Sequence, residues 1–253
     1  HNPLQALRDD YDHFHHIEGE FSEELKVYSG MLKALDRSVG RILDTLEKNN
    51  LTDNTLIVLT SDNGGANYIH LSDINKPYRG WKLTHFEGGL HVPFMAKWPN
   101  KIKPGIEFNA PIHANDILPT FAAAAGAELP DDRIIDGVNL LPFLQNHNSE
   151  MPHETLYWLQ GRLQTVLHEN WKLITDHRTG KDWLFNVESD PYERINLASE
   201  MTLKVEELKR LLNDHKKVQP PPLYDNTMSV PILIDKHNGY TFQDGDEFTY
   251  WDN

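Results

Sequence analysis

Apolar residues recur at spacings of three and four between residues 22 and 49, which is the stripe of an amphipathic helix. The stripe consists of Leu25, Tyr28, Met31, Leu32, Leu35, Val39, Ile42, Leu43 and Leu46. Ser22 is placed to cap the helix, and Glu23 and Glu24 favour the positive end of its dipole. The pattern predicts one long helix that ends at about Asn49 and serves as scaffold.

Two short runs after this helix predict strands. Residues 55–60 are continuously β-branched and apolar, which is typical of a strand buried on both faces of a parallel sheet. Residues 91–98 predict a second strand, and residues 115–125 predict a short alanine-rich helix that ends at Gly126. The order strand, loop, strand, helix indicates an α/β fold with a mostly parallel sheet.

Beyond residue 150 the pattern changes to short strand-like runs separated by turns, which indicates a small antiparallel sheet. These runs cover residues 155–159, 164–168, 171–175 and 183–187. Leucines at helical spacing within residues 200–215 predict a helix that lies on this sheet and stops before Pro220. We expect an extended tail after it. The sequence thus predicts two parts, residues 1–150 as the C-terminal portion of an α/β domain and residues 151–253 as a small subdomain with its tail.

Composition narrows the partners of the chain. Its 253 residues carry 24 basic and 38 acidic side chains, a net charge of −14, which repels nucleic acid and anionic membrane surfaces. No apolar run approaches the roughly 18 residues of a membrane-spanning helix, and the first residues lack the apolar core of a signal peptide. Because the chain opens at a histidine, we expect it to be an internal piece whose targeting signals lie elsewhere.

The first segment with candidate chemistry is Ser61-Asp62-Asn63-Gly64-Gly65, directly after the first predicted strand. Ligands of open α/β sheets bind at the carboxyl ends of strands. Asp62 and Asn63 offer oxygen atoms suited to Ca²⁺ or Mg²⁺, and the two glycines allow a sharp turn beside an ion. Taken alone, the same residues also form an ordinary turn.

The second segment is the glycine-punctuated loop of residues 79–89, which contains Arg79, Lys82 and His85. A lysine is a compact positive charge that can hold an oxygen of an anionic ester. Taken alone, this segment also fits a solvated basic loop.

Together these segments resemble the type I, formylglycine-dependent sulfatases of the alkaline phosphatase superfamily. That family has a strand ending in Asp-Asn-Gly, then a Gly-x-Lys loop ending in Glu-Gly-Gly, then Val-Pro; here these read SDNGG, RGWKLTHFEGG and HVPFMAKWP. The N-terminal HNPLQ, the helix segment YSGMLKALDRSVGRILDTL and the later NDILPTFAAAAGAELP, DGVNLLPFL and LFNVESDPYERINLA also match in order. The resemblance covers residues 1 to about 200.

Carried over by position, the resemblance implies that Asp62 and Asn63 bind a divalent cation, usually calcium, with magnesium as the alternative. It implies that Lys82 binds the sulfate of the substrate and that His1 assists proton transfer to the leaving oxygen. We expect Arg79 and His85, which flank Lys82, to contact substrate as well. The spacing of residues 75–82 is most similar to arylsulfatases of the N-acetylgalactosamine-4-sulfatase kind, which implies a sulfated sugar. The family more often has arginine at the position of His91.

Two parts of the family site are absent from the sequence. The formylglycine nucleophile arises from a Cys/Ser-x-Pro/Ala-x-Arg motif, and an early Asp-Asp pair completes the metal site; neither is found, since Asp9-Asp10 and Asp131-Asp132 lie at the wrong positions. We therefore expect a catalytically incomplete chain whose partner is the missing N-terminal segment of the same protein. The resemblance also suggests a periplasmic or secreted location. Two alternatives stay open: a phosphodiesterase or phosphonate hydrolase of the same superfamily, and a non-catalytic module that binds an anion or a partner.

Overall fold

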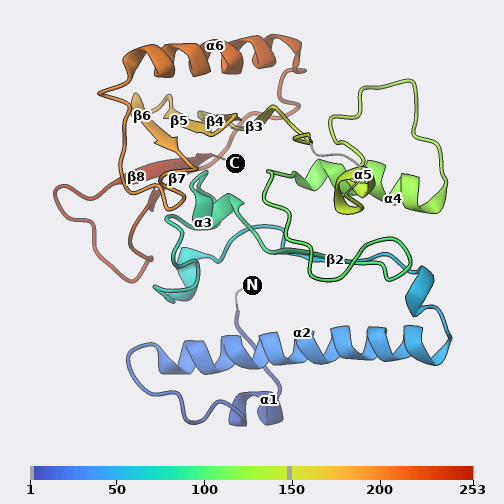
Figure 1. Ribbon diagram of the computed structural model, residues 1–253. Helices are drawn as coiled ribbons and strands as arrows, with labels where there is room; N and C mark the ends of the chain where they lie inside the picture. The colour runs from blue at the N-terminus through green and yellow to red at the C-terminus, as the bar shows by residue number, and fades with distance from the viewer. Residues whose placement is uncertain (1–2, 147–149, 253) are drawn as a thin grey trace. The chain divides into compact units, whose positions relative to one another are not determined.

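The computed structural model describes residues 3–146 and 150–252 (Figure 1). The chain divides into two compact units. Unit 1 comprises residues 1–40, 63–92 and 157–253, and unit 2 comprises residues 41–62 and 93–156. The division at residue 156 lies near the expected boundary at residue 150. Residues 1–40 and 63–92, however, belong to the same unit as the C-terminal sheet.

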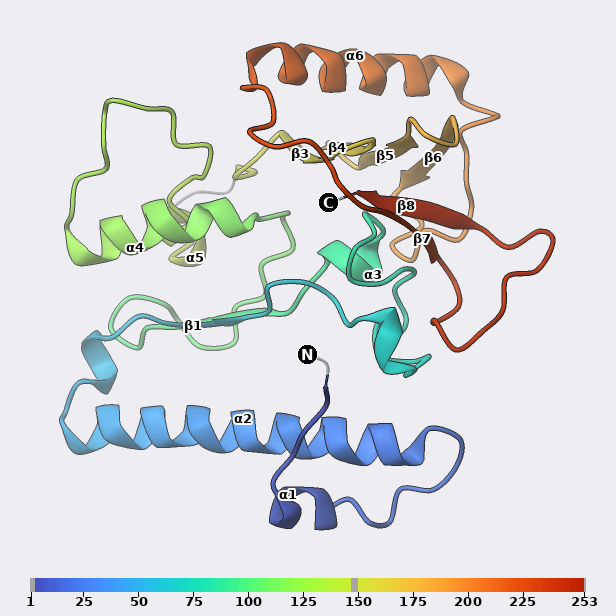
Figure 2. The same ribbon diagram turned by 180° about the vertical axis from the view of Figure 1, so that it is seen from behind.

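The main element of unit 1 is a four-stranded sheet in the order β3-β4-β5-β6. Its strands are β3 (Thr155–Gln160), β4 (Leu163–His168), β5 (Trp171–Asp176) and β6 (Lys181–Asn186). β5 pairs antiparallel with β4 and with β6, as the short runs and turns predict. Helix α6 (Thr202–Val218) lies along one face of this sheet in both views (Figures 1 and 2). The expected antiparallel sheet with one packing helix is therefore confirmed.

Both faces of this sheet are buried. Toward α6, the core consists of Val166, Leu173, Leu184, Val205, Leu208 and Leu212. On the opposite face, Phe86 from the loop of residues 79–89 packs with Leu163, Ile174, Trp183, Phe185 and Ile234. Neighbouring residues such as Leu173 and Ile174 join opposite cores because side chains alternate across a strand. This second core explains why residues 63–92 group with the sheet.

The expected extended tail is wrong in part, because it contains a two-stranded sheet. β7 (Ser229–Leu233) pairs antiparallel with β8 (Phe248–Asp252). Burial stabilises this pairing, since Ile232 and Leu233 are almost completely buried and Ile234 enters the core beside Phe86. The β-branched and aromatic residues of both runs were the available signal for strands.

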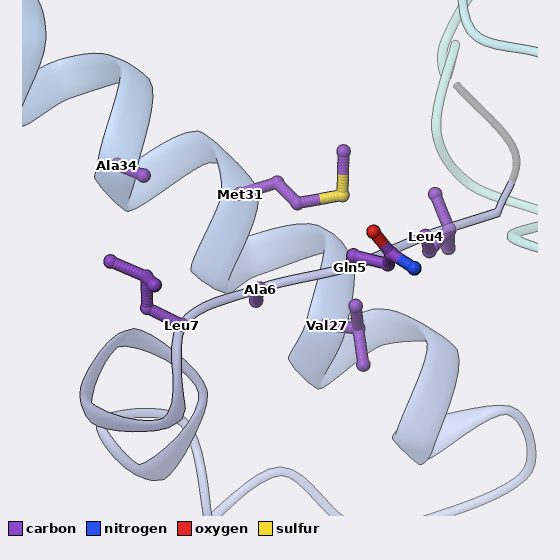
Figure 3. Close-up of a pocket in the computed structure, with 7 residues that line it drawn as sticks. All are labelled: Leu4, Gln5, Ala6, Leu7, Val27, Met31 and Ala34. Carbon is purple, nitrogen blue, oxygen red and sulfur yellow. The ribbon is translucent and has the colours of Figure 1, made fainter.

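Helix α2 (Ser22–Lys48) is the predicted long helix and runs from unit 1 into unit 2. The short helix α1 (Arg8–Asp12) precedes it. The extended segment before α1 crosses α2, and Gly30 allows this approach because a Cβ there would lie 2.9 Å from the Cβ of Ala6 (Figure 3). The buried carboxylate of Asp10 binds the guanidinium of Arg37 through two hydrogen bonds of 2.6 and 2.8 Å. α2 is therefore joined to the N-terminal segment at one crossing.

Unit 2 is built around strands β1 (Ile57–Thr60) and β2 (Phe94–Lys97) with helices α4 (Ile117–Ala125) and α5 (Leu141–Leu144). Its core consists of Trp98, Ile102, Leu140, Leu141 and Leu144. The α/β class is confirmed, as is the end of α4 at Gly126, which adopts φ +66°. The short helices and turns that remain are η1 (Thr52–Asn54), η2 (Asn67–Ile69), α3 (Glu87–Leu90) and η3 (Ala114–Asp116).

The pairing of β1 with β2 corrects the expected parallel sheet. The two strands are antiparallel, with Ile57 opposite Lys97 and Thr60 opposite Phe94. Among the described residues they form a two-stranded sheet, and Leu59 and Met95 are 40% and 56% exposed rather than enclosed. An apolar run indicates that a strand tends to be buried, but it does not indicate whether the neighbouring strand runs parallel or antiparallel.

Candidate functional site

Residues 63–65 of the first candidate segment interlock with the second segment, residues 79–89, through backbone hydrogen bonds within unit 1. The N–H of Gly64 donates to the carbonyl of Gly89 at 3.0 Å, and the N–H of Lys82 donates to the carbonyl of Gly65 at 2.9 Å. The backbone of Lys82 is therefore bonded to a residue two positions after Asn63. Residues 63–65 and 79–89, which are separated in the sequence, thus form one cluster of loops.

Asn75 ties the same loops together with its side chain. Its Oδ1 accepts from the N–H of Gly65 at 2.7 Å, and its Nδ2 donates to the carbonyls of Gly65 at 2.9 Å and Gly80 at 3.0 Å. A buried backbone group without a partner costs about 1–3 kcal/mol, so one amide side chain that satisfies three of them stabilises the cluster. Sequence reasoning gave Asn75 no role in the site.

Three glycines are required at the closest approach of the loops. A Cβ on Gly64 would lie 1.8 Å from the carbonyl oxygen of Gly88. A Cβ on Gly88 would lie 2.3 Å from the carbonyl oxygen of Gly80, and one on Gly89 would lie 2.3 Å from that of Thr84. Backbone oxygens cannot move aside as a side chain can, so the Gly-Gly pairs are needed for this packing.

Lys82 and Asp62 are charged residues of these segments that form no ion pair with another described residue. Lys82 is partly buried and Asp62 is exposed. Asn63 donates from Nδ2 to the carbonyl of Gly64 at 2.9 Å, which fixes its amide group. Asp62 and Asn63 are neighbours on one loop, and their predicted role as metal ligands stays a prediction.

These two ligands fit a hard cation in kind but not in number. Ca²⁺ takes about six to eight oxygen ligands, and carboxylate and amide oxygens are among those it prefers. Among the described residues, no group of three histidine, cysteine or acidic side chains could hold a metal ion. Any metal at this loop would need ligands in addition to Asp62 and Asn63.

Beneath the Lys82 loop lies a buried ionic network that sequence reasoning missed. The ammonium of Lys172 in β5 is 2.6 Å from Glu87 and 2.8 Å from Glu193. Glu193 also accepts from the backbone N–H of Glu87 at 2.6 Å. Glu87 belongs to the Glu-Gly-Gly motif, but Lys172 and Glu193 lie about a hundred residues further on, so no local pattern could have joined them.

The network shifts the pKa values of its two carboxyl groups in opposite directions. Burial opposes ionisation of Glu87, but Lys172 and then the hydrogen bond from His91 outweigh it and lower the pKa of Glu87 to about 2. Burial and the neighbouring Glu87 raise the pKa of Glu193. His91, at the position where the family pattern more often has arginine, binds Glu87 through Nδ1 at 2.8 Å and stacks on Tyr78.

Arg79, for which a substrate contact is predicted, is paired within the protein, and the contact itself stays a prediction. Its guanidinium binds both carboxylate oxygens of Asp235 at 2.7 Å and also pairs with Glu247, and it lies over the ring of Phe86. With its side chain only 14% exposed, Arg79 holds the tail against the loop, and its charge is compensated by two carboxylates.

His85, for which a substrate contact is also predicted, likewise has a partner within the protein, and that contact stays a prediction. Its Nδ1 lies 2.9 Å from the hydroxyl of Thr165 in β4, and the residue is 5% exposed. Burial, with the charge of Lys172 as a second cause, lowers the pKa of His85 to about 3, so it is neutral at physiological pH. His1, the remaining predicted site residue, lies outside the described residues.

A hollow beside the crossing of α2 offers no alternative site. It is lined by Leu4, Gln5, Ala6, Leu7, Val27, Met31 and Ala34 (Figure 3). None of these side chains is charged, so the hollow has no group to compensate an anionic ester or to bind a metal ion. None of the helices in the described part of the chain has the length and apolar character needed to span a bilayer.

Comparison with known proteins agrees with the motif order. The model of the sulfatase family matches residues 1–127, and the model described as N-sulphoglucosamine sulphohydrolase, C-terminal, matches residues 80–218. The chain belongs to the sulfatase family. It is a type I sulfatase chain of the alkaline phosphatase superfamily. Lys82 and Glu87 lie in the stretch that both family models match.

Individual sulfatases match this sulfatase chain over part of their length. A steryl-sulfatase from Rattus norvegicus is 38% identical over 171 residues, covering 65% of this chain and 29% of its own. An ulvan-active sulfatase from Formosa agariphila is 28% identical over 256 residues, covering 85% of this chain and 48% of its own. The solved structure of Ps i-CgsB in complex with k-i-k-neocarrahexaose is 33% identical, with a TM-score of 0.73, and covers 85% of this chain and 47% of that one. The chain therefore spans less than half the length of these relatives.

Proposed function

We propose that this chain is part of a calcium-dependent sulfatase that hydrolyses sulfate esters of sulfated sugars. In this proposal Lys82 binds the sulfate, Asp62 and Asn63 bind the divalent cation, and His1 passes a proton to the leaving oxygen. The observation that carries the proposal is the state of Lys82. Arg79 of the same loop and Lys172, which binds Glu87 of that loop, are both paired with carboxylates, whereas Lys82 forms no ion pair with a described residue.

An unpaired lysine is what sulfate chemistry requires in an acidic protein. With a net charge of −14, the protein as a whole repels a sulfate ester, so a local cation must reverse the field. Charge that grows on the sulfate oxygens during hydrolysis is stabilised by a fixed cation, because a preorganised charge needs no reorganisation as the bond breaks. A bound calcium ion would add a Lewis acid beside Asp62 and Asn63.

The finer assignment to sugars is supported by two relatives. The ulvan-active sulfatase and Ps i-CgsB, whose solved complex contains k-i-k-neocarrahexaose, each match 85% of this chain. The steryl-sulfatase is more identical but matches a shorter part, 65% of the chain. We therefore propose a sulfated carbohydrate as substrate, with a steryl sulfate as the competing class in the assay.

We further propose that the chain is incomplete as a catalyst. It contains no cysteine and no Ser-x-Pro/Ala-x-Arg segment, so it has no precursor of the formylglycine nucleophile. Electrostatic assistance from Lys82 accelerates a displacement only when an attacking group is also positioned. The nucleophile and the other metal ligands would come from the missing N-terminal segment of the same protein.

Kinetics of the full-length protein test the proposal. Lys82→Ala should lower kcat/KM for para-nitrophenyl sulfate and for ulvan oligosaccharides by about 10²- to 10³-fold, as the loss of one preorganised group does in other enzymes. Lys103→Ala is the matched control, because Lys103 is exposed and lies outside the interlocked loops. Equal activity of Lys82→Ala and wild type would refute the role of Lys82.

The same assay separates the alternative functions. A wild-type protein that hydrolyses a phosphonate monoester faster than any sulfate ester would be a phosphonate hydrolase. One that prefers a steryl sulfate to every sulfated oligosaccharide would contradict the sugar assignment. Loss of activity on chelation, restored by Ca²⁺, is expected, and Asp62→Ala should raise the Ca²⁺ concentration that restores it.

A further inference from the structure

Four aromatic rings of unit 1 meet at the loop that follows Asn63. They belong to Phe21, His70, His237 and Tyr240, and we call them the aromatic cluster. The ring centroid of His237 lies 5.1 Å from Phe21, 5.4 Å from His70 and 4.6 Å from Tyr240. His237 is 1% exposed and Tyr240 is 50% exposed, so the cluster has a buried centre and a solvent-facing edge.

Two members of the cluster are held in strained backbone conformations. Phe21 has φ 57° and His70 has φ 60°, in the left-handed region that bulky residues rarely occupy. Such residues cost about 1–3 kcal/mol each and persist where the surrounding structure fixes them, often at ligand sites. Both strained residues direct their rings at the same partner, His237.

The buried centre of the cluster presents a hydrogen-bond donor without an acceptor. The backbone N–H of Gly239 donates to Nδ1 of His237 at 3.0 Å, so Nδ1 carries the lone pair and Nε2 carries the hydrogen. Nε2 is buried and has no acceptor among the described residues. Most buried polar groups are paired, so an unpaired donor at the buried centre of the cluster is a feature that the packing of the fold alone does not explain.

The aromatic cluster is joined to the proposed catalytic loop. Asn67 donates from Nδ2 to Oδ1 of Asn238 at 2.7 Å, and the N–H of Asn238 donates to the carbonyl of Asn67 at 3.2 Å. Asn63 of the proposed metal site and His70 of the aromatic cluster lie at the two ends of one continuous segment, residues 63–70. Lys82 is bonded to this segment at Gly65.

Half of the cluster comes from a part of the chain that neither family model matches. The two models end at residues 127 and 218, whereas His237 and Tyr240 lie in the tail beyond them. The tail is anchored beside the loop by the pairing of Arg79 with Asp235 and Glu247. A segment outside the common family pattern but fixed beside the common site is suited to distinguish one substrate from another.

We propose that the aromatic cluster is a subsite for an uncharged sugar ring that adjoins the sulfated sugar of the substrate. This inference rests on the proposed function of the Lys82 loop. Aromatic rings offer flat apolar faces to the C–H faces of a sugar. The half-exposed Tyr240 provides the accessible ring of the cluster.

The charge around the cluster selects a neutral ring over a second sulfated one. Burial lowers the pKa of His237, with the neighbouring His70 as a further cause, and so keeps His237 uncharged at neutral pH. Glu20 is the carboxylate within electrostatic reach of His237, and its negative charge would repel a sulfate. The cluster therefore recognises hydroxyls and the apolar face of a ring.

The test compares a small and a large substrate in the full-length protein. Tyr240→Ala should raise the KM for k-i-k-neocarrahexaose and ulvan oligosaccharides about tenfold, the equivalent of one lost stacking contact. It should change kcat/KM for para-nitrophenyl sulfate less than about twofold, because that ester has no adjoining sugar. Tyr240→Phe keeps the ring and should behave as wild type toward both substrate classes.

Tyr224→Ala is the matched control, since Tyr224 lies in the same tail and is 85% exposed. The inference is overturned if Tyr240→Ala affects both substrate classes equally, or neither, or if Tyr224→Ala reproduces its effect. Wild-type activity on para-nitrophenyl sulfate but on no oligosaccharide would overturn the subsite while leaving the sulfatase proposal intact. Absence of wild-type activity on every sulfate ester would instead overturn the proposed function.

Discussion

Lys172 shows how one residue holds the candidate site in place. Its side chain is 1% exposed, and its ammonium group is shared by Glu87, next to the glycines of the Lys82 loop, and by Glu193. A buried ion pair adds little compared with well-packed apolar residues, but removal of one partner leaves uncompensated charge in the core. The position of the loop therefore depends on a lysine from the distant strand β5.

We predict that Lys172→Met lowers the free energy of unfolding by about 3–5 kcal/mol, because two buried carboxylates lose their cation. Urea denaturation of the purified protein measures this change. Lys101→Met, at an exposed position, should change it by less than about 0.5 kcal/mol. A loss below about 1 kcal/mol for Lys172→Met would show that the network does not contribute as its burial indicates.

His85 gives a prediction for pH. Its pKa is lowered from 6.5 to about 3 by burial, so between these values the unfolded state binds more protons than the folded state. The free energy of unfolding must therefore fall as the pH falls below 6.5. His85 contributes about 2 kcal/mol to this loss between pH 7 and pH 5. Denaturation at both pH values should show that His85→Gln reduces this dependence. An unchanged dependence would mean that His85 is protonated in the folded protein.

The residue scale also shows where sequence reasoning stops. The motif around Lys82 was identified because all its residues lie within a few positions of one another. The hydrogen-bond and ion-pair partners of Arg79 and His85 were not predicted, because these partners are distant in the sequence. Arg79 binds Asp235 and Glu247 in the tail, and His85 binds Thr165 in β4. Whether a histidine or arginine near a site is available to a substrate depends on such partners.

Among the elements, those with a strong internal pattern were predicted well. Helix α2 begins at Ser22 as predicted, and the runs beyond residue 150 form β3 to β6 under α6. The direction of β1 relative to β2 was not predictable, because residues of a short apolar strand do not encode it. The hairpin of β7 and β8 was missed although its β-branched and aromatic residues favour strands, because part of its stability comes from distant contacts of the tail, such as Ile234 with the core around Phe86 and Asp235 with Arg79.

The interlocked loops lead to a prediction at the scale of elements. Gly64→Ala places a methyl group 1.8 Å from the carbonyl oxygen of Gly88, so the segments that carry Asn63 and Lys82 must separate. We expect kcat/KM of the full-length protein for para-nitrophenyl sulfate to fall by at least about tenfold, since small displacements of positioned groups are costly.

Gly40→Ala is the control for this substitution. Gly40 lies within α2 and its added Cβ would meet nothing within 4 Å, so alanine there should raise stability by up to about 1 kcal/mol and leave kinetics unchanged. If Gly64→Ala retained wild-type kcat/KM, the close packing of the two loops would not be needed for activity.

At the scale of the whole molecule, charge and ligand number set what this chain can do. The net charge of −14 makes a productive encounter with a sulfate ester depend on local cations and a metal ion. In the proposed site, Lys82 would attract the anion, and Asp62 and Asn63 would offer oxygen ligands to a cation. A hard cation needs more ligands than these, and a displacement needs an attacking group.

The last prediction follows from this shortage: the isolated chain of 253 residues should show no sulfatase turnover above background on para-nitrophenyl sulfate. Lys82 lowers a barrier only for a nucleophile that is already in position, and free water lacks that advantage by a large entropic factor. The full-length protein should hydrolyse the ester, and its Lys82→Ala variant should lose most of that rate. Turnover by the purified isolated chain that disappears in its Asp62→Ala variant would overturn this prediction, because a nucleophile would then lie within these residues.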